Sequence, residues 1–447
     1  MVHKKRILSV TLEPIATRMA GPAIRCVEIA KQLAGEFDAT VYSPRPSDLD
    51  AAAICDSKNF HLLAGIGKSE LYAAAENSDV IFIQANVLKP LPGLARLEKP
   101  LVVDLYDPYL LAILAQYEPD SPTSGASYNL MHKVLEQHMA RADFSVCASE
   151  RQRDYWLGRY CSLGRLTPRM YKLDRTFRNL IDVVPFGLPG EPAKRTGPGV
   201  KGVLPGIGTD DFLLLWGGGI WEWFDPLTVI KAVAQLSLKH PRLKLYFMGF
   251  KSPNPQVPLM DMAVKAKDLA LSLGVLDKNV FFSETWTSYE DRVNVLLDAD
   301  VAVSAHFDMT ETRFSFRTRI LDYLWAGLPT FTTCGDQLAD MINAHEAGKS
   351  LGYEDLTAWV TALDEVLSNP ALIQRYKHGS QVLSQQFTWD KVVEPLRTFC
   401  RNPHRLPSHQ TVQMPSIVDR AKAVYSRGGK DLVLKRSREI LQDLLRG

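Results

Sequence analysis

The sequence predicts an α/β protein with two Rossmann-like domains, whose parallel sheets face each other across a cleft. Three observations support this prediction. Short apolar runs alternate with longer helical patterns, as in parallel βα units. The alternation stops at residues 188–208, which are dense in glycine and proline and are predicted to form a linker, and then it restarts. A chain of 447 residues also has the length of about two or three domains.

The first half, residues 1–187, is predicted to form one domain. Six apolar runs are its expected strands: residues 6–12, 39–44, 79–84, 100–106, 143–149 and 181–186. Helical patterns lie between them at about residues 22–34, 68–76, 128–141 and 149–160. The basic start of the chain runs into Thr11, Glu13 and Pro14, so we interpret it as a first strand and not as a signal peptide.

The second half, residues 209–386, repeats the pattern without a detectable sequence repeat. Its expected strands are residues 211–219, 243–250, 279–284, 300–306 and 329–335. Its expected helices are residues 225–240, 290–299, 316–326 and 336–347. Ligands of two such sheets bind at the carboxyl ends of the strands, so the cleft is the expected site.

Composition excludes several classes of protein. The 52 basic and 50 acidic side chains give a net charge of +2, which argues against a nucleic-acid partner. The six cysteines are scattered without a C-x-x-C pair, which is typical of reduced thiols in a cytoplasmic protein and not of a zinc site or a disulfide framework. No stretch approaches the roughly 20 apolar residues that span a bilayer.

Positive charge is concentrated in two segments. Residues 151–178 hold eight Lys or Arg against two Asp, and residues 401–447 hold ten against four acidic residues, so each segment carries a net charge of +6. One interpretation is an ordinary solvated surface. The other is attraction to an anionic bilayer or to a lipid-phosphate acceptor. Residues 403–447 are accordingly expected to form a basic helical tail, which either packs on the body of the protein or binds a membrane surface.

One predicted helix, residues 316–326, has an unusual start. Ser315 is a suitable N-cap and Gly327 a suitable C-terminal residue, but Arg317 and Arg319 lie in the first turn. Cations there oppose the helix dipole at a cost of roughly 0.3–1 kcal/mol each. A phosphate bound at this N-terminus would reverse the penalty. Thr318, Arg319 and Asp322 share one face, which places the carboxylate of Asp322 for sugar hydroxyls; a surface Arg–Asp pair is the alternative.

Two further loops resemble phosphate sites. Residues 213–226 end a strand in three glycines, of which Gly218 and Gly219 could approach a ligand closely, and continue to Trp221, whose ring could line a sugar or base pocket. Asp225 is the expected N-cap of the helix that follows. In the first half, Gly21 opens a helix with Arg18 and Arg25 near its mouth.

Two other candidates are weaker. Asp298 and Asp300 form a D-x-D pattern, which we interpret as the boundary between a helix and a strand and not as a metal site. His306 follows a strand but has no visible catalytic partner. No metal site and no cofactor are therefore expected.

Residues 5–400 resemble the GT-B glycosyltransferases of the large retaining family 4, in its bacterial polysaccharide and glycoconjugate branch. The segments that carry the resemblance are "VVPFGLP", "WGGGIWEWFDPLTVIKAVAQL", "FRTRILDYLWAGLPTFTT" and "FTWDKVVEPLRTF". The last resembles the helix that returns to the first domain, here residues 387–402. The resemblance implies a GT-B fold, a donor site for a nucleoside-diphosphate sugar in the second domain and an acceptor site in the first.

Position by position, the resemblance assigns the diphosphate to Arg319, the donor ribose to Asp322 and the phosphate loop to Gly218 and Gly219. The family's upstream glutamate falls on Phe314, so Glu311 is the expected substitute. Arg319, Arg317 and Glu311 are thus the expected catalytic residues. The histidine that often follows the fourth strand aligns with Tyr106, so Tyr106 or Asp107 is expected to contact the sugar.

The resulting interpretation is a cytoplasmic glycosyltransferase that needs no metal and retains anomeric configuration. Its partners would be the sugar donor, a glycan, lipid-linked or small-molecule acceptor, and an inner membrane face contacted through the basic tail. A GT-B sugar-nucleotide epimerase and a non-enzymatic two-lobed binding protein are the alternatives. Trapping a glycosylated product would distinguish the transferase from the epimerase. Arg317 and Arg319, placed to bind a phosphate, argue against the binding protein.

Overall fold

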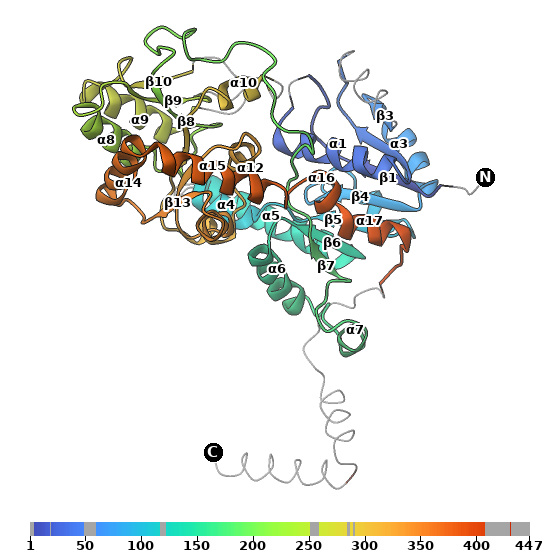
Figure 1. Ribbon diagram of the computed structural model, residues 1–447. Helices are drawn as coiled ribbons and strands as arrows, with labels where there is room; N and C mark the ends of the chain where they lie inside the picture. Colours follow the sequence, from blue (N-terminus) through green and yellow to red (C-terminus); the bar gives the residue numbers. More distant parts are fainter. Residues whose placement is uncertain are drawn as a thin grey trace, which may run out of the picture.

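A computed structural model shows two α/β lobes joined side by side (Figure 1). The structure describes residues 4–17, 19–48, 60–116, 122–250, 259–283, 287–288, 291–406 and residue 430. Arg18 and nearly all of the predicted basic tail lie outside these ranges.

The first lobe is built on a seven-stranded sheet of order β3-β2-β1-β4-β5-β6-β7, in which all neighbouring strands are parallel. Its strands are β1 Arg6–Val10, β2 Asp38–Ser43, β3 His61–Ala64, β4 Val80–Gln84, β5 Leu101–Asp104, β6 Phe144–Cys147 and β7 Ile181–Val183. Its helices are α1 Gly21–Ala34, α3 Lys68–Glu76, η1 Pro92–Arg96, α4 Tyr109–Gln116, α5 Pro122–Arg141, α6 Glu150–Ser162 and α7 Pro168–Leu173.

The second lobe is built on a six-stranded parallel sheet of order β10-β9-β8-β11-β12-β13. Its strands are β8 Phe212–Trp216, β9 Leu243–Phe247, β10 Val280–Phe282, β11 Val301–Ser304, β12 Thr330–Thr333 and β13 Gly348–Leu351. Its helices are α8 Pro226–Ser237, α9 Asp261–Ser272, α10 Arg292–Leu296, α11 Thr310–Phe314, α12 Thr318–Trp325, α13 Gln337–Ala344, α14 Leu356–Ser368 and α15 Pro370–Ser384.

Two parallel sheets, one in each lobe, confirm the predicted fold class. The two outer strands β3 and β13 were not expected from the sequence. Each is only four residues long, and the β13 segment "GKSL" carries a glycine, a lysine and a serine. The apolar run that marks a buried strand is therefore missing from β13. The short helices α4, α7 and α11 escaped prediction because one or two turns give little periodicity. Three longer helices, α9, α14 and α15, were not predicted either.

The end of the chain crosses back to the first lobe. Leu188 of the linker forms a bridge with Thr388, and α16 (Trp389–Val392) packs on α1. The next helix, α17 (Glu394–Arg401), stacks Phe399 on Phe144 with ring centroids 4.9 Å apart. A helix was expected here; two short helices form instead, and Pro395 lies in the first turn of the second one.

One apolar cluster joins the lobes through these returning helices. It contains Phe186 at the end of the first lobe and Trp389 of α16, whose ring centroids lie 5.0 Å apart, and it continues to Phe316 in the second lobe. Gly187 lies against Trp389 so closely that a Cβ atom there would come within 2.3 Å of the ring. In the described ranges, no helix has the length and apolar character needed to cross a membrane.

Candidate functional site

A cavity of about 180 Å³ lies where the carboxyl ends of the first sheet face the second lobe. It brings together Gly21, Arg25, Tyr106 and Asp107 of the first lobe with Thr318 of the second. All five residues were singled out from the sequence, although more than 200 positions separate Thr318 from the others in the chain. The predicted cleft is therefore a real cavity to which both lobes contribute.

Two helix N-termini border this cavity. Gly21 is the first residue of α1 and Thr318 is the first residue of α12. Neither N-terminus receives a hydrogen bond from the side chain of its N-cap residue, which is Ala20 for α1 and Arg317 for α12. Unfilled amide donors and two helix dipoles thus converge on one space, an arrangement that favours a bound anion.

The start of α12 differs from the prediction. Helix 316–326 was expected with Ser315 as its N-cap, but α12 begins at Thr318 and the Ser315 hydroxyl donates backwards to the carbonyl of Thr312. Gly327 does adopt the expected left-handed conformation, with φ of +67°. The error arises because Ser315 caps locally within α11, a contact that competes with the N-cap role.

Arg319 is a partly buried cation without an acidic partner among the described residues. Its Nη2 donates to the carbonyl oxygen of Gly219 at 2.7 Å, whereas its Nη1 is buried without a hydrogen-bond partner in the same part of the chain. The guanidinium stacks on Phe224, 4.1 Å from the ring centroid. Burial lowers the pKa of Arg319 to about 10. The charge is thus held in a site that an anion would stabilise.

The glycine loop after β8 supports this cation. Gly218 has φ of +79°, which favours glycine, and its neighbour Gly219 supplies the carbonyl for Arg319. The amide of Gly217 donates to the Tyr323 hydroxyl at 2.6 Å, so the loop is fixed to α12. Asp225 caps α8 as expected, accepting from the amide of Thr228.

Arg317 is not a second free cation, which corrects the sequence interpretation. It is the N-cap residue of α12, and its Nη2 pairs with the Glu311 carboxylate at 2.7 Å. Both side chains are buried, and α11, which carries Glu311, contacts α4 and α6 of the first lobe. The pair neutralises both groups and leaves Arg319 as the unbalanced charge.

Asp322 also has a partner that the sequence did not predict. It shares a helix with Arg319, but its Oδ1 accepts from Arg292 at 3.0 Å, and the Arg319–Asp322 pair that was the alternative interpretation is not formed. Arg292 stacks on Trp325 as well. The carboxylate is only partly exposed, so Arg292 sets its orientation. Nothing in the sequence pointed to Arg292, because its position in the predicted helix 290–299 lies 30 residues from Asp322.

Arg25 is committed to a partner within its own lobe. Its guanidinium makes two bonds to the Asp104 carboxylate, at 2.7 and 3.0 Å, and donates to the carbonyls of Pro185 and Val184. Burial opposes its charge, but Asp104 more than offsets this, and the pKa of Arg25 is raised. Arg25 lines the cavity as predicted, but Asp104 balances its charge. Asp104 was missed, although an acidic residue that ends the apolar strand "LVVD" is a recognisable signal.

Tyr106 and Asp107 supply polar atoms to the same cavity. The Tyr106 hydroxyl is buried and has no hydrogen-bond partner in the described residues, and burial holds its pKa well above the ordinary value. Burial, with Asp104 and Glu311 nearby, raises the pKa of Asp107 to about 7 even though Arg25 opposes the change. Asp107 can therefore exist as an acid or as a carboxylate near neutral pH.

The remaining candidate residues make contacts with other residues of the folded protein. Trp221 is half-buried, stacks on Trp223 with centroids 5.5 Å apart, and does not line the cavity. Asp298 and Asp300 accept from the backbone amides of the linker and of β8, as expected for a boundary. His306 is fully buried, and burial lowers its pKa to about 3. Among the described residues, no cluster of three His, Cys, Asp or Glu could hold a metal ion.

Comparison with known proteins agrees with this geometry. No model of a known protein family matches the chain. The chain is 24% identical over 229 residues to a D-inositol 3-phosphate glycosyltransferase of Saccharomonospora viridis, an alignment that covers 50% of this chain and 51% of that protein. The match thus spans about half the length of this curated relative.

Two solved structures are similar over most of the chain. HepE of Anabaena in complex with UDP-glucose superposes with a TM-score of 0.63 at 14% identity, covering 89% of this chain and 99% of HepE. WaaG, a glycosyltransferase involved in lipopolysaccharide biosynthesis, superposes with a TM-score of 0.59 at 17% identity, covering 89% and 100%. At these identities the likeness shows the fold. The protein has the GT-B fold, with two Rossmann-like lobes, as the sequence predicted.

Proposed function

We propose that the protein transfers a sugar from a nucleoside-diphosphate donor to the hydroxyl of an acceptor, with retention of configuration, as in the family 4 glycosyltransferases it resembles. The observation that carries the proposal is Arg319. It is a partly buried cation whose Nη1 is buried without a partner, with no acidic partner among the described residues, at the N-terminus of α12 and against the Gly217–Gly219 loop. A diphosphate is the anion that this combination of amides and guanidinium would bind best.

The donor would lie along the second lobe. The Arg319 guanidinium and the uncapped amides of α12 would stabilise the negative charge that develops on the leaving diphosphate. The free Oδ2 of Asp322 would accept hydrogen bonds from the ribose, while Arg292 holds Oδ1. HepE is similar in fold and was solved with UDP-glucose, which supports a uridine nucleotide as the first donor to test.

The sugar and the acceptor would meet in the cavity between the lobes. Tyr106 and Asp107 would bind hydroxyl groups there, and the N-terminus of α1 at Gly21 would face the phosphates or a phosphorylated acceptor. The named activities of the relative and of WaaG support a sugar-phosphate or lipid-linked acceptor. We further propose a cytoplasmic enzyme that uses Arg319 where other enzymes use a divalent cation.

Thermal unfolding with added nucleotides tests the donor site. A ligand that binds only the folded state raises stability as RT ln(1 + [L]/Kd), so UDP, GDP and ADP can be ranked by the shift in Tm. We expect one nucleoside diphosphate to raise the Tm of the wild-type protein and to leave the Tm of Arg319→Ala unchanged. Arg313→Ala is the matched control, because it removes an exposed cation six positions away.

Product analysis then separates transfer from the alternatives. With the stabilising nucleotide supplied as its sugar conjugate, mass spectrometry should find a glycosylated acceptor and a released nucleoside diphosphate. An epimerised sugar nucleotide without a glycosylated product would contradict the transferase, and a bound but unchanged donor would favour a binding protein.

A further inference from the structure

The basic segment 151–178 divides into two groups in the folded protein. Five of its eight cations donate to groups within the chain: Arg151, Arg153, Arg159, Arg165 and Arg178. Three are exposed and have no partner among the described residues: Arg169, Lys172 and Arg175. All three lie on α7 or within two residues of its end. The charge excess seen in the sequence is thus concentrated on one short helix.

The same helix exposes apolar side chains. Tyr171 is 52% exposed and Leu173 is 76% exposed, and no residue of α7 is buried. Single exposed apolar side chains are common, but here they lie beside exposed cations, a combination found at membrane-surface contacts. We name the α7 surface as Arg169, Tyr171, Lys172, Leu173 and Arg175. It combines three unpaired cations with two uncovered apolar side chains.

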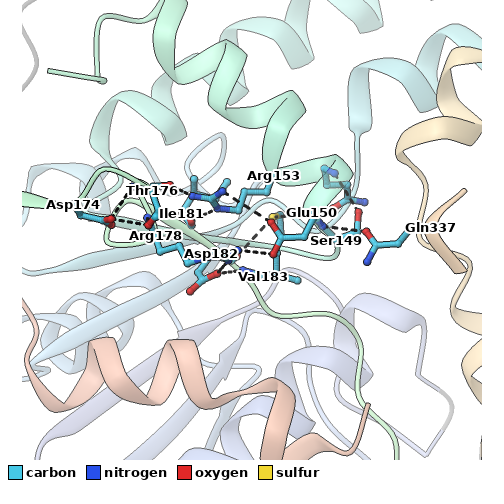
Figure 2. A network of polar contacts seen from close by, with 12 residues as sticks. Ser149, Glu150, Arg153, Asp174, Thr176, Arg178, Ile181, Asp182, Val183 and Gln337 are labelled. Carbon is cyan, nitrogen blue, oxygen red and sulfur yellow. Dashed lines mark hydrogen bonds and ion pairs between the residues drawn. The ribbon is translucent and has the colours of Figure 1, made fainter. Parts of the chain in front are cut away.

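The turn that follows α7 is firmly held. The Asp174 carboxylate accepts from the amides of Thr176 and Asn179, and Phe177 has φ of +56°, which is unfavourable for a bulky residue. Arg153 donates to the carbonyls of Thr176 and Ile181, as Figure 2 shows. A rigid turn therefore presents the α7 surface.

A second set of bonds joins this turn to α6 and to the second lobe. Arg178 pairs with Glu150 and with Asp182 (Figure 2). The amide of Glu150 donates to Gln337 at the start of α13. These internal bonds account for Arg153 and Arg178, so neither cation belongs to the α7 surface.

The location of α7 also matters. It lies at the outer end of the first lobe, away from the second lobe (Figure 1). Arg165, two residues before the N-cap of α7, lines a pocket together with Arg405 and Leu406. Residues 405 and 406 thus lie close to the start of α7.

We propose that the α7 surface binds the headgroup region of an anionic bilayer. Tyrosine and leucine side chains insert at the level of the headgroups while cations attract acidic lipids. A bilayer needs no shape complementarity, whereas a stable protein partner would need about 800 Å² of matching surface on each side, which a six-residue helix does not offer.

Vesicle flotation of the full-length protein tests the surface. Wild-type protein should float with phosphatidylcholine vesicles that contain phosphatidylglycerol, should not float with phosphatidylcholine alone, and should be released by salt. The α7 variant replaces Arg169, Lys172 and Arg175 with glutamine. At about fivefold for each cation, it should bind on the order of a hundredfold more weakly.

A matched control removes the same charge elsewhere. Three exposed cations on the second lobe are replaced with glutamine: Lys231, Lys265 and Lys278. This control should bind vesicles like the wild type, because its charges lie on the other lobe. Tyr171→Ser with Leu173→Ser should also weaken vesicle binding. All variants should keep the wild-type Tm, because the changed side chains are exposed.

The proposal would be overturned by three results. The first is a wild-type protein that binds no anionic vesicle. The second is an α7 variant that binds as tightly as the second-lobe control. The third is vesicle binding that survives the α7 substitutions but is lost when Lys435, Arg436 and Arg438 of the full-length chain are replaced with glutamine, which would assign the contact to the C-terminal segment alone. Capture of an acidic soluble protein without vesicle binding would likewise reject the bilayer.

Discussion

Arg25 in the first lobe and Arg319 in the second lobe occupy comparable positions, and they differ in what balances their charge. Each lies within the first turns of a helix that starts above the carboxyl ends of a parallel sheet. Arg25 is bound on two sides by Asp104 and by two backbone carbonyls. Arg319 has one carbonyl and an aromatic ring. An arginine that is paired with an acidic residue of the protein stabilises the fold. An arginine that lacks such a partner can bind an anionic ligand.

Breaking the first-lobe pair should have the largest effect on stability. Arg25→Ala leaves the Asp104 carboxylate buried and unpaired, which should lower the free energy of unfolding by about 3–5 kcal/mol. Urea denaturation followed by circular dichroism measures the loss. The double variant Arg25→Met with Asp104→Leu should recover much of it, since an apolar pair of similar volume costs little. If Arg25→Ala were as stable as the wild type, the pair would not hold the lobe together.

Removing the second-lobe cation should instead affect the reaction. Arg319→Ala should lower kcat/KM by about 10²–10³, the effect of one lost donor to the developing charge. Its stability should be unchanged or higher, because an unbalanced buried charge disappears. Steady-state release of nucleoside diphosphate measures the rate. Arg317→Ala should have a smaller effect on the rate, since that guanidinium is paired with Glu311. Near-normal turnover of Arg319→Ala at saturating donor would contradict the assignment.

Asp107 is an acidic group in the same cavity whose charge Arg25 only partly offsets. Its pKa is raised from 3.8 to about 7 by burial and by Asp104, so the folded state keeps a proton that the unfolded chain releases. The stability that this proton contributes is present in full below pH 3.8 and is lost as the pH rises through about 7. Thermal unfolding of wild type and Asp107→Asn at pH 5 and pH 8 measures the difference.

The expected result is a smaller fall in Tm between these pH values for Asp107→Asn than for the wild type, by about 2–4 °C for each kcal/mol involved. Asp210→Asn is a control, because the side chain of this aspartate is 84% exposed on the second lobe. Parallel pH profiles for wild type and Asp107→Asn would show that Asp107 is ionised in the folded state throughout the range.

Chelation should have the smallest effect. If Arg319 and the helix N-termini stabilise the diphosphate, transfer should continue in EDTA at close to its normal rate. Loss of activity in EDTA that Mg²⁺ or Mn²⁺ restores would contradict the role of Arg319. A metal ion would then stabilise the diphosphate charge that we assign to Arg319.

Much of the fold follows from local sequence. Eleven of the strands were expected as buried apolar runs between turn signals, including the run observed at residues 181–183. Several of them end two or three residues earlier than expected. Helix α8 begins after its Asp225 cap as expected, because capping depends on residues a few positions apart. Some elements that escaped prediction are short or have little apolar periodicity, as in β13 and α7. The longer helices α9, α14 and α15 were also not predicted, and their length does not explain the omission.

The candidate site was predictable only as a set of residues. The sequence placed Gly21, Tyr106, Asp107 and Thr318 at the carboxyl ends of strands or at helix starts, and a parallel sheet brings such positions to one edge. It could not say which arginine is balanced. Asp104 lies 79 residues from Arg25, and Arg292 lies 30 residues from Asp322. No local pattern encodes such pairs.

The two parallel sheets could be predicted from the sequence, because apolar periodicity, turn chemistry and capping act over a few residues. Which charges are paired could be read only from the folded chain. Folding joins Arg25 to Asp104, Arg317 to Glu311 and Asp322 to Arg292, and it leaves Arg319 partly buried without a counter-ion among the described residues. The physical reason is that the free energy of a charge depends on its burial and on neighbours distant in the chain, which folding alone brings together.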